Sequence, residues 1–138
     1  MTPSLIEQFF GDLDSLDVGA LTARMTPGCR LLSADGRRAE GIEAASELLG
    51  EFVSQLRSTA HRITAHWHID DVWIAEVEAD YELADRLLLT AVPRAFVIRE
   101  QDGAIADVRV YGAHERRLAD HGGDDEGMRI AGRWLPPL

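Results

Sequence analysis

VWIAEVEADYEL, residues 72–83, decides the fold class, because its side chains change character at every step. From Trp73 to Leu83, apolar or aromatic side chains occupy every second position, and acids fill the positions between them from Glu76 to Glu82. A period of two is typical of an antiparallel strand with one buried and one solvated face. We therefore expect Tyr81 to point into a core and the acidic stripe to face water.

The segments on either side of this stretch also favour strands. Pro93 interrupts one of them, which indicates a bulge or an edge position. In the segment before, His61, Ile63 and Trp67 share one parity, so we expect them on one face. The strand segments are HRITAHWHI (61–69), LLLTAVPRAFVIRE (87–100) and AIADVRVYGAHE (104–115).

The N-terminal part has helical spacing instead. Ser4 and Glu7 form a capping box before an apolar series that ends at Leu13, and Asp17 can cap a short second helix. Asp35-Gly36 predicts a tight hairpin turn, and a third helix follows over residues 42–57. Helices followed by a run of strands indicate an α+β domain whose helices pack on one face of an antiparallel sheet.

Composition narrows the function classes. The 138 residues suffice for one core, and 46% hydrophobic with 28% charged residues is typical of a soluble domain. A net charge of −10 with scattered basic residues argues against nucleic acid and anionic membranes as partners. The single cysteine, Cys29, and the lack of a signal-peptide pattern predict a cytoplasmic protein without an intrachain disulfide.

Three segments in order resemble the nuclear transport factor 2-like superfamily, within it the SnoaL-like branch. They are FFGDLDSLDVGALTARMTPGCRL (9–31), GIEAASELLGEF (41–52) and AFVIREQDGAIADVRVYGAHE (95–115). The resemblance implies a cone-shaped barrel, in which a curved, mostly antiparallel sheet wraps around three N-terminal helices. It places the domain in residues 1–118, followed by an acidic, Gly-rich tail, residues 119–138.

The superfamily hosts isomerases, dehydratases, cyclases, epoxide hydrolases and plain binding modules, so the resemblance leaves the activity open. Limonene epoxide hydrolase chemistry is not expected, because its last-strand carboxylate position is Ala113 here. Scytalone dehydratase is a partial match, through Thr59, His61 and Trp67.

His61 is the candidate catalytic acid/base, since a neutral imidazole can exchange protons near neutral pH. The candidate ligand-binding residues are Tyr81, Tyr111, Trp67, Phe52 and His114, and we expect no metal and no cofactor. A buried carboxylate beside His61 would favour catalysis over binding. Asp80 and Asp107 are the carboxylates considered for that position.

The leading hypothesis is a cofactor-independent isomerase, dehydratase or cyclase acting on a hydrophobic, oxygenated small molecule. The alternatives are a non-catalytic binding module for such a ligand and an accessory subunit. We also expect a homodimer, because Leu88, Val92 and Val97 would leave an apolar patch on the sheet of a monomer and relatives pair sheet against sheet.

Overall fold

A computed structural model describes residues 3–112 and 136–138 of the chain. The helices are α1 (Leu5–Asp14), α2 (Val18–Ala23) and α3 (Ile42–Ser54). The strands are β1 (Met25–Leu32), β2 (Arg38–Glu40), β3 (Leu56–Ile69), β4 (Val72–Leu83), β5 (Leu88–Gln101) and β6 (Ala104–Gly112). They form one open sheet in the order β2-β1-β6-β5-β4-β3, in which only β1 and β6 run parallel. The α+β class and element order are as predicted.

The predicted start and turn signals are confirmed. The Ser4 side chain accepts from the Glu7 amide while the Glu7 carboxylate reaches back to the Ser4 amide, and Asp17 caps α2 through the Ala20 amide. Gly36 adopts a positive φ of 88° in the turn between β1 and β2, a backbone conformation that glycine reaches without strain.

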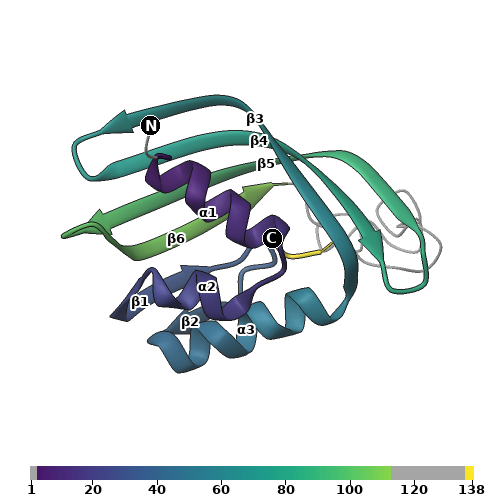
Figure 1. Cartoon of the computed structure of the whole chain (residues 1–138), viewed down its shortest axis with the longest axis horizontal. Coiled ribbons are helices and arrows are strands. Elements are labelled where there is room, and N and C mark those ends of the chain that lie inside the picture. Colours follow the sequence, from purple (N-terminus) through teal and green to yellow (C-terminus); the bar gives the residue numbers. More distant parts are fainter. Residues whose placement is uncertain (1–2, 113–135) are drawn as a thin grey trace.

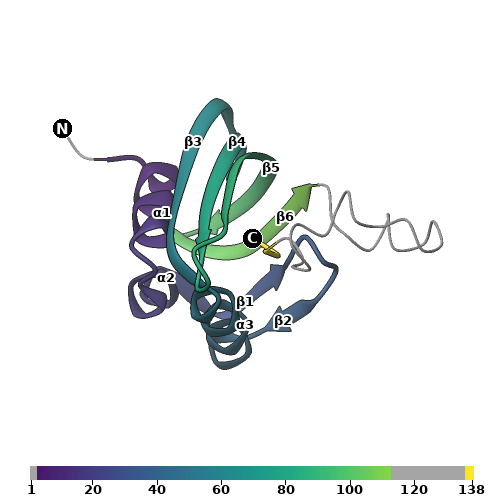
Figure 2. The ribbon, with the colours of Figure 1, turned by 90° about the vertical axis from the view of Figure 1, so that its right-hand side faces the viewer.

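The two faces of the sheet differ as the period of β4 predicts. We call "inner" the face of Ala75, Val77, Ala79 and Tyr81, which is buried, and "outer" the face of the acidic stripe. α1 lies in front of the sheet in the view of Figure 1, and its Phe9 and Phe10 pack edge-on against Phe96 of β5. Figure 2 shows the sheet curving away from α1. The core lies between this helix layer and the inner face.

β3 departs from the predicted pattern. It begins at Leu56, where the sequence predicts the end of α3, and it contains a bulge. Ile63 pairs with Val77, but Ala65 pairs with Glu76, so the extra residue Thr64 exchanges the two faces. The prediction that Trp67 shares the face of His61 is therefore wrong. Beyond the bulge, His66 and His68 take the inner face and Trp67 the outer one.

β5 contains the bulge that Pro93 suggested, but it is not an edge strand, since it lies between β4 and β6. The register shifts opposite Asp80, and Ala91 adopts a φ of 54° there. The amide of Ala91 donates to Asp80 Oδ1 at 2.8 Å. The outer-face carboxylate thus anchors the bulge.

Of the predicted tail, only residues 136–138 belong to the described part, so its boundary at residue 119 lies outside it. These three residues are buried, and Figure 1 marks this end of the chain inside the outline of the fold. Within the described residues, each helix is too short or too polar to cross a bilayer.

Candidate functional site

His61 lies at the centre of the inner face. It pairs with Ala79 of β4, and its imidazole is 0% exposed, although its main chain on the edge strand β3 is accessible. Aromatic rings enclose the imidazole: the centroid distances are 5.4 Å to Phe10, 5.9 Å to Phe96 and 6.3 Å to Tyr81. The histidine therefore occupies an almost wholly apolar environment.

Asp14 supplies the carboxylate of this site. It is the last residue of α1, and its Oδ1 lies 2.7 Å from His61 Nδ1 while its Oδ2 accepts from the His61 amide at 3.2 Å. A carboxylate at a helix C-terminus is disfavoured by the helix dipole, so these two N–H donors compensate for its position. The Asp14 side chain is 31% exposed and links the buried ring to solvent.

This contact orients the ring. A carboxylate accepts hydrogen bonds, so Nδ1 is the nitrogen that donates to Asp14, and a neutral imidazole in this orientation keeps its lone pair on Nε2. Within the described residues Nε2 is buried and has no hydrogen-bond partner. Burying such an atom costs about 1–3 kcal/mol, and a cost of this kind in a folded protein calls for an explanation. A ligand that donates or releases a proton at Nε2 would supply one.

Tyr81 is the second polar group of the interior. Its side chain is 1% exposed, with its ring edge-on to His61 and to Phe52. Burial raises the pKa of the Tyr81 phenol, and the nearby Arg94 guanidinium opposes that rise only in part. The phenol thus stays protonated at neutral pH, and its hydroxyl donates to the main-chain oxygen of Leu138.

Arg94 of β5 lies beside Tyr81 and is 3% exposed. Its Nη2 donates to the Pro136 carbonyl at 2.5 Å. Opposite it in β6 is Gly112, where a Cβ would lie 2.6 Å from Arg94 Nη1 and 2.9 Å from the Pro93 carbonyl. Because Gly112 has no side chain, the Arg94 guanidinium can occupy this position.

The structure brings together some of the predicted site residues and separates others. Phe52 is buried against Tyr81. Trp67 and Tyr111 lie on the outer face, 47% and 45% exposed, with Tyr111 opposite Ala95. Their expected place in the interior is wrong. His114 lies outside the described residues.

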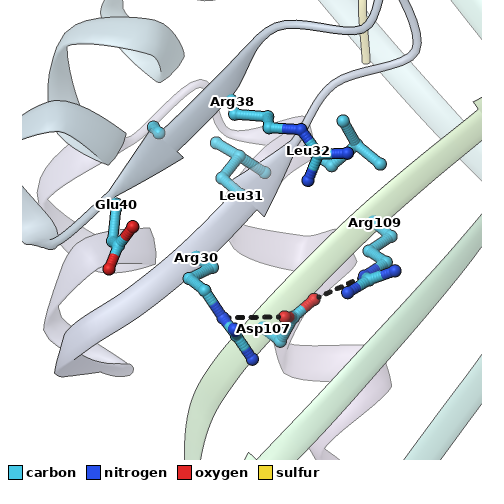
Figure 3. A pocket seen from close by; sticks show the side chains of 8 residues that line it. Arg30, Leu31, Leu32, Arg38, Glu40, Asp107 and Arg109 are labelled. Atoms are coloured by element: carbon cyan, nitrogen blue, oxygen red, sulfur yellow. Dashed lines mark hydrogen bonds and ion pairs between the residues drawn. The ribbon is translucent and has the colours of Figure 1, made fainter.

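The two carboxylates considered for His61 also lie on the outer face. Asp80 pairs with Arg62 at 2.6 Å, in the solvated stripe that the sequence predicts. Asp107 is buried, but between Arg30 at 3.2 Å and Arg109 at 3.3 Å, in a hollow of about 260 Å³ (Figure 3). The inner carboxylate, Asp14, was missed.

Among the described residues, no set of three or more histidine, cysteine or acidic side chains is placed to hold a metal ion. The described residues form two further hollows, of about 470 and 620 Å³, and His61 lines neither of them nor the hollow at Asp107.

No protein-family description matches the chain, and no curated protein matches it. Solved structures do. A hypothetical protein with a ketosteroid isomerase-like fold from Catenulispora acidiphila, in complex with trimethylamine, superposes with a TM-score of 0.76 at 18% identity, over 91% of this chain and 98% of that one. A SnoaL-like candidate polyketide cyclase from Shewanella denitrificans gives 0.72 at 8% identity, over 84% and 92%.

An LEH-like epoxide hydrolase from M. tuberculosis gives a TM-score of 0.66 at 17% identity, over 77% of each chain. At these identities the likeness concerns the fold. The chain has the fold of the nuclear transport factor 2-like superfamily, including its ketosteroid isomerase-like and SnoaL-like members. The resemblance noted from the sequence is confirmed at this level.

Proposed function

We propose that this chain, with its nuclear transport factor 2-like fold, is a cofactor-independent acid–base enzyme of the isomerase, dehydratase or cyclase type. One observation carries the proposal: Asp14 Oδ1 lies 2.7 Å from His61 Nδ1, while Nε2 is buried and unpartnered within the described residues. An oriented imidazole with a buried lone pair is the arrangement that a general base requires.

The reaction would begin with a C–H proton next to a carbonyl group of the substrate. Nε2 of His61 takes that proton, and the electron pair of the C–H bond moves to the carbonyl oxygen, giving an enolate. The Asp14 carboxylate stabilises the imidazolium formed. The imidazolium then returns the proton to another carbon, which is isomerisation, or to a departing hydroxyl group, which is dehydration.

The surroundings select the substrate class. The Phe10, Phe96 and Tyr81 rings leave His61 an apolar environment, which suits a hydrophobic molecule with few oxygens. The same environment removes competing water, so the charge of Asp14 acts on the imidazolium more strongly than it would in solvent.

A non-catalytic binding module for such a molecule is the second candidate. It is favoured by the 0% exposure of the imidazole, since a substrate must reach Nε2 and no described hollow includes it. Binding without turnover at His61 would establish this candidate.

The test uses nitrobenzisoxazole, a probe that any well-placed base opens by removing one C–H proton. The N–O bond breaks in the same step, and the coloured cyanophenolate is followed by absorbance. We expect turnover by the native chain and a loss of about 100-fold or more in His61→Phe, the lower range for general base catalysis. His68→Asn, on the same face, is the control and should keep full turnover.

His61→Phe also separates function from stability. His61→Ala would not separate them, because removing a ring this buried would leave a cavity costing about 2–5 kcal/mol. Phe fills that space and removes the unpartnered Nε2, while the partly exposed Asp14 can rehydrate. Thermal unfolding should therefore show a His61→Phe variant at least as stable as the native chain. Residual turnover at the native rate in that folded variant would refute His61 as the base.

We further propose that the chain is a cytoplasmic homodimer that pairs outer face to outer face. Trp67 and Tyr111 leave large apolar groups exposed there, and Leu88 is 63% exposed, whereas Val92 packs against the core. Sedimentation should give a dimer mass at micromolar concentration, and Trp67→Lys should shift it towards monomer. The single cysteine, Cys29, is buried, which suits a reducing compartment.

A further inference from the structure

Residues 136–138 enter the fold as a ligand would. One main-chain oxygen of each of these three consecutive residues accepts a hydrogen bond from a different part of the chain. Tyr81 Oη of β4 donates to Leu138, and Arg94 Nη2 of β5 donates to Pro136 at 2.5 Å. The amide of Ala34, in the turn between β1 and β2, donates to Pro137 at 2.8 Å.

The two side-chain donors are built into the interior. Tyr81 and Arg94 are 1% and 3% exposed, and a buried donor needs an acceptor, because leaving it unsatisfied is costly. Both donate to main-chain oxygens of the tail. A phenol and a guanidinium side by side suit the oxygens of a ketone, an ester or a carboxylate.

The body of the tail is apolar. Leu138 is 2% exposed and belongs to the core cluster, and Pro136 is also fully buried. The tail thus presents carbonyl oxygens on a branched hydrocarbon frame, which is the chemistry of a small acyl compound.

The tail also lies next to the acid–base pair. The Tyr81 ring that holds Leu138 through its hydroxyl meets His61 edge-on, with 6.3 Å between ring centroids. An acyl compound in place of the tail would put its oxygen on Tyr81 and bring its carbon frame towards His61.

We propose that Tyr81 and Arg94 form a binding site for a small acyl compound, a carboxylic acid or ketone with a branched apolar body, and that Pro136–Leu138 occupies this site as a built-in competitor. The binding site stands on the tail contacts alone. Only the step in which the bound compound reacts at His61 rests on the proposed function.

The first test removes the tail and returns it as a separate molecule. A chain lacking residues 136–138 should bind the peptide N-acetyl-Pro-Pro-Leu at one site in calorimetry. Tyr81→Phe should weaken this binding by about two- to tenfold, the effect of one hydrogen bond, and Arg94→Met should weaken it as well. Tyr111→Phe on the outer face is the matched control and should change nothing. Absence of saturable binding, or binding indifferent to both inner substitutions, would overturn the site.

Small molecules then define the ligand class. Isocaproic acid and methyl isobutyl ketone should displace the peptide, whereas isoamyl alcohol, which has the branched body without a carbonyl, should not. If only the acid competes, Arg94 sets the class; if both compete, the Tyr81 hydroxyl suffices. Displacement by the alcohol as strong as by the acid would show that no carbonyl is recognised.

A second measurement uses the full chain and does not depend on the truncated one folding. The Ala34 amide bonds to Pro137, so its hydrogen exchange reports whether the tail is docked. Exchange at Ala34 should quicken about two- to tenfold in Tyr81→Phe and stay unchanged in Tyr111→Phe. Unchanged exchange in Tyr81→Phe would show that Tyr81 does not hold the tail.

Turnover of nitrobenzisoxazole separates this site from the proposed activity. Truncation should raise turnover, and added peptide should lower it again. Peptide binding without any turnover would remove the proposed catalysis and leave the site. If the peptide does not lower turnover and does not bind, the proposed site is removed and the proposed catalysis remains.

Discussion

Two histidine–carboxylate pairs lie on the inner face of the sheet, and they differ in what covers them. His61 Nδ1 meets Asp14 at 2.7 Å, and His68 Nε2 meets Glu100 at 3.2 Å. The His61 imidazole is 0% exposed, but that of His68 is 40% exposed. His68 stacks on Trp73, with ring centroids 3.6 Å apart, and Trp73 Nε1 also donates to Glu100.

The chemistry available to each pair follows from this coverage. At His68, water can reach the ring, so the pair resembles, when His68 is protonated, an exposed ion pair, which contributes about 0–1 kcal/mol. At His61, Phe10 of α1 closes over the ring and leaves Nε2 in an apolar interior. Both pairs join an imidazole to a carboxylate, and burial decides which of the two can act on a ligand.

The largest effect should come from removing the charge of Asp14, and removing the charge of Glu100 is the comparison. In Asp14→Asn the amide oxygen can still accept from Nδ1, but no negative charge stabilises the imidazolium. We expect nitrobenzisoxazole turnover to fall by about 100-fold or more, as for a lost acid–base contribution. Glu100→Gln is the matched control and should keep native turnover. Equal losses in both variants would abolish the distinction between the pairs.

The sequence could predict His61 but not its partner. Strand parity placed the ring inside, because the pairing of β3 is regular from Ser58 to Ile63. Asp14 lies 47 residues away, and only the packing of α1 against β3 brings the two together. Helical periodicity marks Asp14 as a polar residue at a helix end, and nothing in that pattern indicates which strand it reaches.

The face of Trp67 was predicted wrongly and the docking of Leu138 was not predicted, each for its own reason. A bulge adds one residue without changing hydrophobic character, so Thr64 reversed the parity of Trp67 with no sign in the sequence. The docking of Leu138 depends on donors from β4, β5 and a turn, which no local pattern brings together. The local features were predicted well because each depends on residues that are neighbours in the chain. They are the helix caps, the turns and the alternation of β4.

Deleting Thr64 should have the next largest effect, because the bulge keeps the two pairs on one face. Without it, regular alternation would turn Trp67 inwards and His68 outwards, which breaks the His68–Trp73 stack. We expect urea unfolding to show a loss of about 2–4 kcal/mol, the range of severe single changes. Thr64→Ala keeps the residue count and loses only the hydroxyl bond to the Glu76 carbonyl at 3.1 Å. A deletion no worse than this control would mean that the bulge is not needed.

Alkaline pH should lower stability through the buried Tyr81 beside His61 before it acts through the exposed His68–Glu100 pair. The raised pKa of Tyr81, caused first by burial, means that the unfolded chain loses this proton more easily than the folded one. Its contribution to stability is fully present below the unfolded pKa of about 10 and is lost as pH rises towards the folded value. Across that window the free energy of unfolding should fall steeply with pH when Tyr81 is present and less steeply in Tyr81→Phe. The same slope in both would exclude Tyr81 as its cause.

The smallest effect concerns the exposed pair itself. Glu100→Gln removes the charge facing His68, but the amide oxygen still accepts from Trp73 Nε1, so the stack should persist. We therefore expect urea unfolding to change by less than about 1 kcal/mol, the upper value for a surface ion pair. Added salt screens the native pair, so the difference between native and variant should shrink further at high ionic strength. His68→Asn at low salt completes the comparison, since it removes the stack and should cost more than Glu100→Gln. If Glu100→Gln alone costs more than about 2 kcal/mol, or if salt leaves its effect unchanged, then the exposed pair is a structural element of the hairpin, and exposure does not separate the two pairs.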